Sequence, residues 1–242
     1  MSGNRVAIIL LTLLLCSVLP STVIAGDDSP PIPQWTDDFN LNACRFATTG
    51  SNSYFILQPG HQLILAGVDE GDSATLIITV LNETIVVDGV ETRIVEERES
   101  KNGELIEVSR NFFAFCETNG SIFYFGEDVD MYDEGEITSH SGAWRAGADS
   151  ARAGLMLPGL PLIGAAYYQE IAPGKAMDRA RIISTTAVFE CPAGRFEDCL
   201  ITEETTPLEP DAREEKVYAP GIGLVKDGPL VLINCLNPGR SK

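Results

Sequence analysis

The sequence predicts an all-β fold, built as a single antiparallel, strongly curved sheet or an open barrel with long loops rich in Pro and Gly. Three observations lead to this prediction. Runs of β-branched and apolar residues, which favour strands, recur along most of the chain. Turn signals separate these runs at spacings of about 8–15 residues, as in an antiparallel meander. No stretch keeps a helical period of 3.6 residues over three turns.

The first strands are predicted around three hairpin turns. Residues 74–81 and 84–87 lead into Asp88-Gly89, a dipeptide that favours the tight turn of a hairpin. Asn102-Gly103 and Asn119-Gly120 are further turns of this kind. The strands that these turns join are expected at 90–100, 104–116 and 121–129.

The second half of the chain begins with an apolar stretch, 155–164, that is predicted to be a loop or an edge segment because it contains two prolines. Further strands are expected at 165–171, 178–191, 196–206, 213–219 and 224–235.

Two strands are apolar on successive residues, at 112–115 and 122–125. Side chains alternate between the faces of a strand, so both faces of these strands should be covered. A sheet wrapped around a loop would cover them, and so would a barrel that closes over a ligand cavity. For most of the aromatic residues nearby, a place in a solid core is the simpler interpretation. The candidates for lining an apolar binding cavity are Phe113, Phe115, Phe123, Phe125, Trp144, Tyr167 and Tyr168.

The N-terminus has the features of a secretory signal peptide at residues 1–25, with Arg5 before an apolar run and Ala25 at the cleavage position. The run is about 14 residues long, shorter than the roughly 20 that a membrane-spanning helix needs. Cys16 offers a lipid anchor as an alternative, but Leu15 stands where a lipoprotein signal has a small residue. We expect a flexible tether at 26–36 and a single β-rich domain at 37–242, without a further membrane span. The expected location is periplasmic or extracellular.

Five cysteines follow the predicted signal peptide. An exported protein meets an oxidising compartment, so disulfides are expected, and an odd number leaves one thiol over. We predict Cys191–Cys199, because the intervening Pro192-Ala193-Gly194 would fold the segment back on itself. We also predict Cys44–Cys235, which would pin the N-terminal stretch to the last strand. Cys116 would then be the free thiol.

The charge of the chain excludes some partners. Lys and Arg number 17 against 35 Asp and Glu, a formal net charge of −18. Nucleic acids and anionic membrane surfaces select for basic proteins, so neither is an expected partner.

The densest acidic run places six carboxylates within ten residues. Hard oxygen ligands at this density suit Ca²⁺, although the spacing does not follow an EF-hand loop. A solvated acidic turn is the simpler interpretation, and no other cofactor is expected. The run consists of Glu127, Asp128, Asp130, Asp133, Glu134 and Glu136.

Catalytic motifs are absent from the sequence. There is no G-x-S-x-G, no H-E-x-x-H and no G-x-x-x-x-G-K. A hydrolase would have to rely on paired carboxylates, such as Glu170 with Glu203 or Glu204. Abundant carboxylates do not by themselves define a catalytic pair, so an enzyme is not the favoured class.

Several phrases of the chain resemble a widespread, uncharacterised family of exported prokaryotic β-rich proteins. They include the YFGEDV phrase at 124–129, an APG phrase at 172–174, the TPLEP phrase at 206–210 and YAPGIGLV at 218–225. The resemblance spans about residues 53–230 in the same order. It implies a domain similar to the curved half-barrel of periplasmic lipoprotein carriers, and it carries no assigned activity. The chain departs from the family pattern at its cysteines, among them Cys116 and Cys191.

Glycines recur in these phrases and at neighbouring turn signals, where a positive φ is expected. They are Gly60, Gly126, Gly174, Gly194, Gly221 and Gly223.

The function expected from the sequence is that of a non-catalytic binding or accessory protein of the cell envelope. It would hold an apolar ligand, or a segment of a partner protein, on the concave side of a curved sheet. A Ca²⁺-binding envelope protein that uses residues 127–136 and a secreted hydrolase remain the alternatives.

Overall fold

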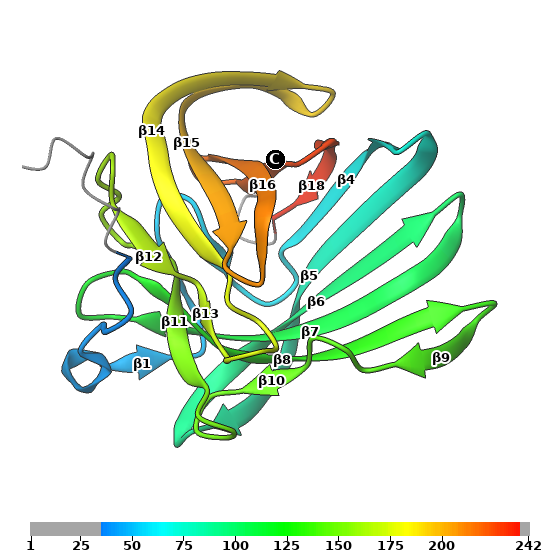
Figure 1. The fold of residues 1–242 in the computed structure, drawn as a ribbon. Coiled ribbons are helices and arrows are strands. Elements are labelled where there is room, and N and C mark those ends of the chain that lie inside the picture. The colour runs from blue at the N-terminus through cyan, green and yellow to red at the C-terminus, as the bar shows by residue number, and fades with distance from the viewer. Residues whose placement is uncertain (1–34, 238–242) are drawn as a thin grey trace, which may run out of the picture. The chain divides into compact units, whose positions relative to one another are not determined.

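The computed structural model describes residues 35–237 and is all-β, as predicted (Figure 1). The predicted signal peptide and all but the end of the predicted tether lie outside the described residues. A three-residue 3-10 turn, η1 (Leu41–Ala43), is the one helical element between residues 35 and 237. No helix in this part of the chain is long and apolar enough to cross a membrane.

The strands vary in length from two to sixteen residues. They are β1 Phe46–Ala47, β2 Gly50–Ser51, β3 Ile56–Leu57, β4 Gln62–Asp69, β5 Asp72–Val87, β6 Val90–Lys101, β7 Glu104–Cys116, β8 Ile122–Asp133, β9 Glu136–Ser139, β10 Trp144–Arg145, β11 Arg152–Leu157, β12 Ala166–Tyr168, β13 Glu170–Ile171, β14 Arg179–Cys191, β15 Gly194–Thr206, β16 Glu209–Ala219, β17 Gly223–Asp227 and β18 Leu230–Leu236.

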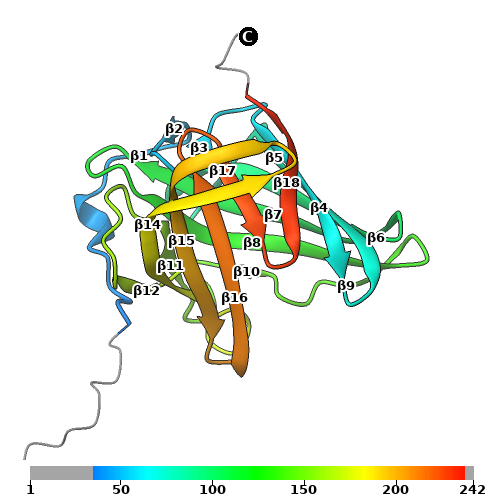
Figure 2. The same cartoon turned by 90° about the horizontal axis from the view of Figure 1, so that it is seen from above.

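One large antiparallel sheet curls into a nearly closed barrel (Figures 1 and 2). Its strands follow the order β12-β14-β15-β16-β17-β18-β4-β5-β6-β7-β8-β11-β13. The two end strands, β12 and β13, are neighbours in the chain and are separated only by Gln169. The backbone N–H of Gln169 donates to the carbonyl of Asp178 at 2.7 Å. The covalent chain therefore brings the two ends of the sheet together.

The predicted hairpin turns set the register of the long strands. Asp88 and Gly89 both have positive φ, as do Asn102 and Gly103, and this backbone twist matches the twist of the flanking strands. The two runs predicted at 74–81 and 84–87 form one continuous strand, β5. Its register with β6 shifts between Val80 and Thr84, so an irregularity replaces the expected break.

All six glycines singled out in the sequence have positive φ. Gly126 nevertheless lies within strand β8 and not at a turn. A Cβ atom at this position would lie 2.4 Å from the carbonyl oxygen of Trp144 on β10. The register of β7 with β8 shifts next to it, and such a bulge re-aims the side chains that follow. Tyr124 and Glu127 therefore both face the interior, where their side chains are 3.1 Å apart.

The successive aromatic residues of β7 and β8 are covered on both faces, as predicted. Phe112 and Phe123 are buried on the outer face. Phe46 on β1 packs edge-on against Phe123 and Phe125, with ring centroids 5.8 and 5.4 Å apart. The N-terminal segment of the described chain thus covers the outside of the barrel at this point.

The disulfide joins Cys44 to Cys116, with the two Cα atoms 5.3 Å apart. The predicted Cys44–Cys235 bond and the predicted free thiol at Cys116 are therefore wrong. The reason lies in the pairing of β1 with β7, which sets Phe46 opposite Cys116 and carries Cys44 to the end of β7.

The predicted Cys191–Cys199 bond is also wrong, because both thiols are free. The segment does fold back at Pro192-Ala193, but this tight turn sets Cys191 opposite Gly194. Cys199 lies opposite Ala187 instead, and its side chain is fully buried.

The last two residues of the predicted tether belong with the barrel. Thr36 pairs with Tyr167 in a parallel bridge. The ring of Trp35 lies 4.4 Å from the guanidinium of Arg179, a cation–π contact.

Candidate functional site

The inward faces of four strands change from apolar to charged along their length. Residues two apart on a strand share a face, so the inward row of each strand can be followed residue by residue. The four rows are Val95, Glu97 and Glu99 on β6; Phe113, Asn111, Ser109 and Glu107 on β7; Leu200, Thr202 and Glu204 on β15; and Tyr218, Lys216 and Glu214 on β16.

The register of the sheet aligns these changes. Glu97 lies opposite Ser109 and Glu99 opposite Glu107. In the second pair of strands, Glu204 lies opposite Glu214. The interior of the barrel consequently has an apolar region and an acidic region.

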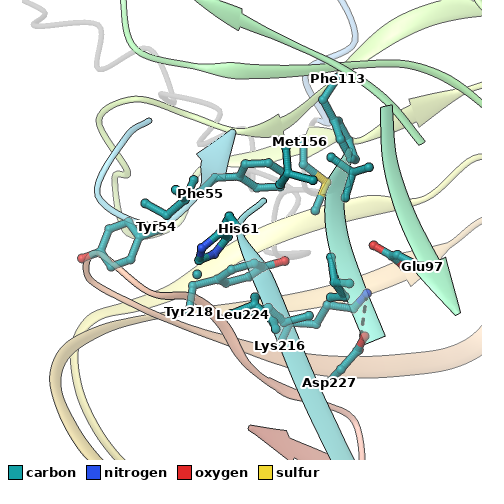
Figure 3. A pocket seen from close by; sticks show the side chains of 16 residues that line it. Tyr54, Phe55, His61, Glu97, Phe113, Met156, Lys216, Tyr218, Leu224 and Asp227 are labelled. Atoms are coloured by element: carbon teal, nitrogen blue, oxygen red, sulfur yellow. Dashed lines mark ion pairs between the residues drawn. The ribbon is translucent and has the colours of Figure 1, made fainter. Parts of the chain in front are cut away.

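The apolar region holds a cavity of about 70 Å³ (Figure 3). Phe55, Phe113, Met156 and Leu224 form its apolar wall, while Glu97, Lys216 and Asp227 lie at its polar end.

His61 also borders the apolar cavity. Its Nε2 atom lies 2.9 Å from the carbonyl oxygen of Ile222. Burial lowers the pKa of His61, so its imidazole is neutral near pH 7 and adds no cation to the interior.

The acidic region holds a second cavity of about 160 Å³. The two cavities share Glu97, Phe113, Met156 and Lys216, so they adjoin one another. The acidic cavity is lined by six carboxyl groups and one amine. These groups belong to Glu97, Glu107, Glu127, Glu170, Asp178, Glu204 and Lys216.

Lys216 forms ion pairs with two carboxylates of the chain itself. Its Nζ atom lies 3.4 Å from an oxygen of Glu204 and 3.4 Å from an oxygen of Asp227. Burial opposes the charge of Lys216, but Asp227 and Glu204 raise its pKa well above the usual range. The amine is therefore charged, and its charge is shared between these two partners.

Lys216 also borders two grooves of about 280 and 450 Å³. Both grooves include Pro229, and the larger includes Arg213. These two residues are exposed, so the acidic region has a route to the surface at this end.

The other carboxyls that line the acidic cavity have few neighbours that would stabilise their negative charge. Burial raises the pKa of Glu97 to about 8 and that of Glu127 to about 7. Burial, followed by the charge of Glu127, raises the pKa of Glu170 well above its usual range. Neither Glu97 nor Glu170 makes a side-chain hydrogen bond or ion pair with the residues at 35–237. Without a cation from outside the chain, the carboxyl of Glu97 holds a proton near pH 7, because burial disfavours its charged form.

Two buried tyrosines face the same interior. The hydroxyl of Tyr124 makes a short hydrogen bond to Asn111 and lies 3.1 Å from a carboxylate oxygen of Glu127. Tyr218 is only 2% exposed, and its hydroxyl has no hydrogen-bond partner in the described part of the chain. Figure 3 shows this hydroxyl directed into the space between the apolar wall and the polar end. An unsatisfied buried hydroxyl costs stability, so this group is available to a ligand.

The seven aromatic residues proposed from the sequence divide by location. Phe113 lines both interior cavities. Phe123, Phe125 and Trp144 are buried in the core, and Phe115 packs against it. Tyr167 lines an outer groove of about 270 Å³.

Tyr168, the last of the seven, packs against Trp35 with the ring centroids 6.4 Å apart. Most of the seven are thus placed as core residues, and Phe113 is the one that the described interior cavities use.

The structure separates the six carboxylates of the acidic run. Glu127 faces the interior, Asp128 pairs with Arg145 at 2.8 Å, and Asp130 pairs with Arg110 at 3.2 Å. Alternation along β8 sends neighbours to opposite faces. In residues 35–237, no group of three or more His, Cys, Asp or Glu side chains is placed to hold a metal ion. The members at the turn between β8 and β9 are exposed, namely Asp133, Glu134 and Glu136.

The carboxylate pairs suggested for a hydrolase are partly brought together. Glu170 and Glu204 line the same cavity. Glu204 also accepts a hydrogen bond of 3.0 Å from the side-chain amide of Gln169. Glu203 pairs with the exposed Arg213 at 3.3 Å instead, so it does not take part in the interior.

Most of the interior carboxyls were not singled out from the sequence, although a signal for them was present. Val95 is apolar and strand residues alternate, so Glu97 and Glu99 must share its inward face. The same reasoning places Lys216 beside Tyr218. Their meeting in one cavity depends on the curvature of the sheet, which no local pattern contains.

Comparison of the chain with protein-family models, with curated proteins and with solved structures finds no match.

Proposed function

We propose that this protein is an exported, non-catalytic binding protein that holds a small, partly apolar ligand inside its barrel. The observation that carries the proposal is the pair of adjoining cavities, one apolar and one acidic, that share Glu97, Phe113, Met156 and Lys216. Binding sites are typically concave and mostly apolar, with a few polar groups that fix the orientation of the ligand.

Two further observations support this proposal. The hydroxyl of Tyr218 and the carboxyls of Glu97 and Glu170 lack side-chain partners among residues 35–237, and a ligand would supply them. The Cys44–Cys116 disulfide is typical of proteins in an oxidising compartment, which agrees with export.

The proposal is tested with phenethyl alcohol, a small neutral probe that has an apolar ring and one hydroxyl. We expect it to shift the amide NMR signals of Val95, Phe113 and Leu224 in a saturable manner. Val95→Phe fills the apolar cavity and should abolish these shifts. The matched control is Val86→Phe, because Val86 is 66% exposed. Shifts that persist in Val95→Phe would overturn the proposal, as would the absence of binding by this probe and by its analogues phenethylamine and hydrocinnamate.

A further inference from the structure

We propose that the ligand of this barrel is an organic cation, whose ammonium group binds among Glu97, Glu127 and Glu170 while its apolar part occupies the adjoining cavity. This inference rests on the proposed function and specifies the chemical class of the ligand.

The first argument is the charge balance of the acidic cavity. Six carboxyls line it, and Lys216 is the one cationic side chain among its lining residues. The Nζ atom of Lys216 is paired with Glu204 and Asp227, at 3.4 Å from an oxygen of each. A carboxylate that leaves water without a partner is costly, so the unpaired carboxyls favour either a proton or a bound cation.

The second argument is the unpartnered hydroxyl of Tyr218. This side chain is 2% exposed, and its oxygen points toward Lys216 and Glu97 (Figure 3), two residues that line both cavities. A hydroxyl oxygen accepts a hydrogen bond from an ammonium N–H. Several buried polar atoms of residues 35–237 lack a partner, and the Tyr218 hydroxyl is the hydroxyl among them that borders the apolar cavity. A ligand in the cavity would supply the hydrogen bond that this hydroxyl lacks.

The carboxyls are arranged for an organic cation better than for a metal ion. A metal needs several oxygen ligands at about 2.0–2.6 Å from one point, and no such group exists among residues 35–237. Phe113 and Tyr124 also line the acidic cavity. The face of an aromatic ring attracts an ammonium group, and this attraction adds to that of the carboxylates.

The size of the cavities limits the ligand. The volumes are about 70 and 160 Å³, and one water molecule needs roughly 10–15 Å³ on the same scale. The interior therefore accommodates on the order of fifteen non-hydrogen atoms, which suits a single small amine with a short apolar body.

Binding should also release protons. The groups facing the site are the carboxyls of Glu97 and Glu99 on β6, Glu107 on β7, Glu127 on β8, Glu170 on β13 and Glu204 on β15, together with Asp178, Lys216 and Tyr124. Burial raises the pKa values of Glu97 and Glu127 to about 8 and about 7. An ammonium group replaces protons on these carboxyls, so its affinity should rise between pH 6 and pH 9.

Three probes of matched shape test the inference: phenethylamine, phenethyl alcohol and hydrocinnamate. Binding of each to the purified protein is measured by calorimetry and by amide NMR shifts. We expect the amine to bind at least tenfold more tightly than the alcohol and the anion. In Glu97→Gln/Glu170→Gln the ratio of amine affinity to alcohol affinity should fall close to one. The control is Glu203→Gln, whose carboxylate faces away from the cavity, and it should keep the native ratio.

Each outcome distinguishes the two proposals. Equal affinity for the amine and the alcohol would overturn the organic cation and leave the proposed function intact. The absence of binding by all three probes would overturn both. Displacement of the amine by Ca²⁺ at equal concentration would show that the site is a metal site and would also overturn the inference.

Discussion

The outer and inner faces of strands β7 and β8 are built in opposite ways. On the outer face, Phe112 and Phe123 are almost fully buried, and Phe46 packs against Phe123. On the inner face, Glu107 and Glu127 border a cavity, and both carboxyls have pKa values raised by burial. The same two strands thus combine a well-packed stabilising surface with one that costs stability. Local rules of protein stability are typically broken at functional sites, so the inner face is where the function is expected.

The largest effect is expected on the outer face. Phe123→Ala removes a buried ring that packs against Phe39 and Phe46 and should lower the free energy of unfolding by about 3–5 kcal/mol. Urea unfolding measures this change. The control is Ile137→Ala, because Ile137 is 49% exposed. Equal effects of the two substitutions would show that the outer face is not the packed core.

The disulfide fastens the N-terminal segment over the same outer face. Its cysteines are 72 residues apart in sequence, and closure of a loop of this length corresponds to about 4 kcal/mol. The double substitution Cys44→Ala/Cys116→Ala should therefore lower the free energy of unfolding by about 4 kcal/mol. Addition of a thiol reductant to the native protein should reproduce the loss, measured as a lower melting temperature. An unchanged melting temperature in both experiments would contradict the assigned bond.

Removal of the interior cation should also destabilise the fold. Lys216→Met leaves Glu204 and Asp227 without their shared partner, which should cost about 3 kcal/mol in urea unfolding at pH 7. Lys226→Met is the matched control on β17, because its partner Glu215 is half exposed. Exposed ion pairs contribute only about 0–1 kcal/mol. A loss of stability in Lys226→Met as large as in Lys216→Met would argue against a special interior role.

Stability should fall as the pH rises, because the folded state binds interior protons more tightly than the unfolded state does. The pKa of Glu97 is about 8 in the folded protein against 4.5 as its ordinary value. Stability from this group is therefore fully present below about pH 4.5 and is lost progressively up to about pH 8. Glu97→Gln should raise the stability at pH 9 by on the order of 2–4 kcal/mol and change little at pH 4.

Melting temperatures across this pH range measure the effect of Glu97→Gln. Its control is Glu203→Gln, whose pH profile should follow that of the native protein. A native melting temperature that is constant from pH 5 to pH 9 would show that the interior carboxyls are not perturbed.

The smallest effect is expected at the acidic turn between β8 and β9. Glu134→Gln and Glu136→Gln replace exposed carboxylates that line none of the interior cavities described above. Each should change the stability by less than about 0.5 kcal/mol and leave the affinity for phenethylamine unchanged. A tenfold loss of amine affinity in either variant would place the cation site outside the barrel.

The fold was predictable because its signals are local. Asp88-Gly89 fixes a hairpin whatever the rest of the chain does, and the apolar run at 122–125 requires cover on both faces. The disulfide depends instead on how β1 docks against β7, and so the predicted partner of Cys44 was wrong. Glu97 could have been assigned to an inward face from its spacing to Val95. That it meets Glu170 there depends on the closure of the barrel.

The position of bound phenethylamine would test the interior site most directly. Intermolecular NOEs, measured on the native protein at pH 8, report which protons lie next to the ring. We expect NOEs from the ring to Val95, Met156 and Leu224, and from the methylene next to the ammonium to Tyr124 and Glu170. NOEs confined to exposed residues, such as Leu160 and Ile163 on the outer loop, would contradict a ligand site inside the barrel.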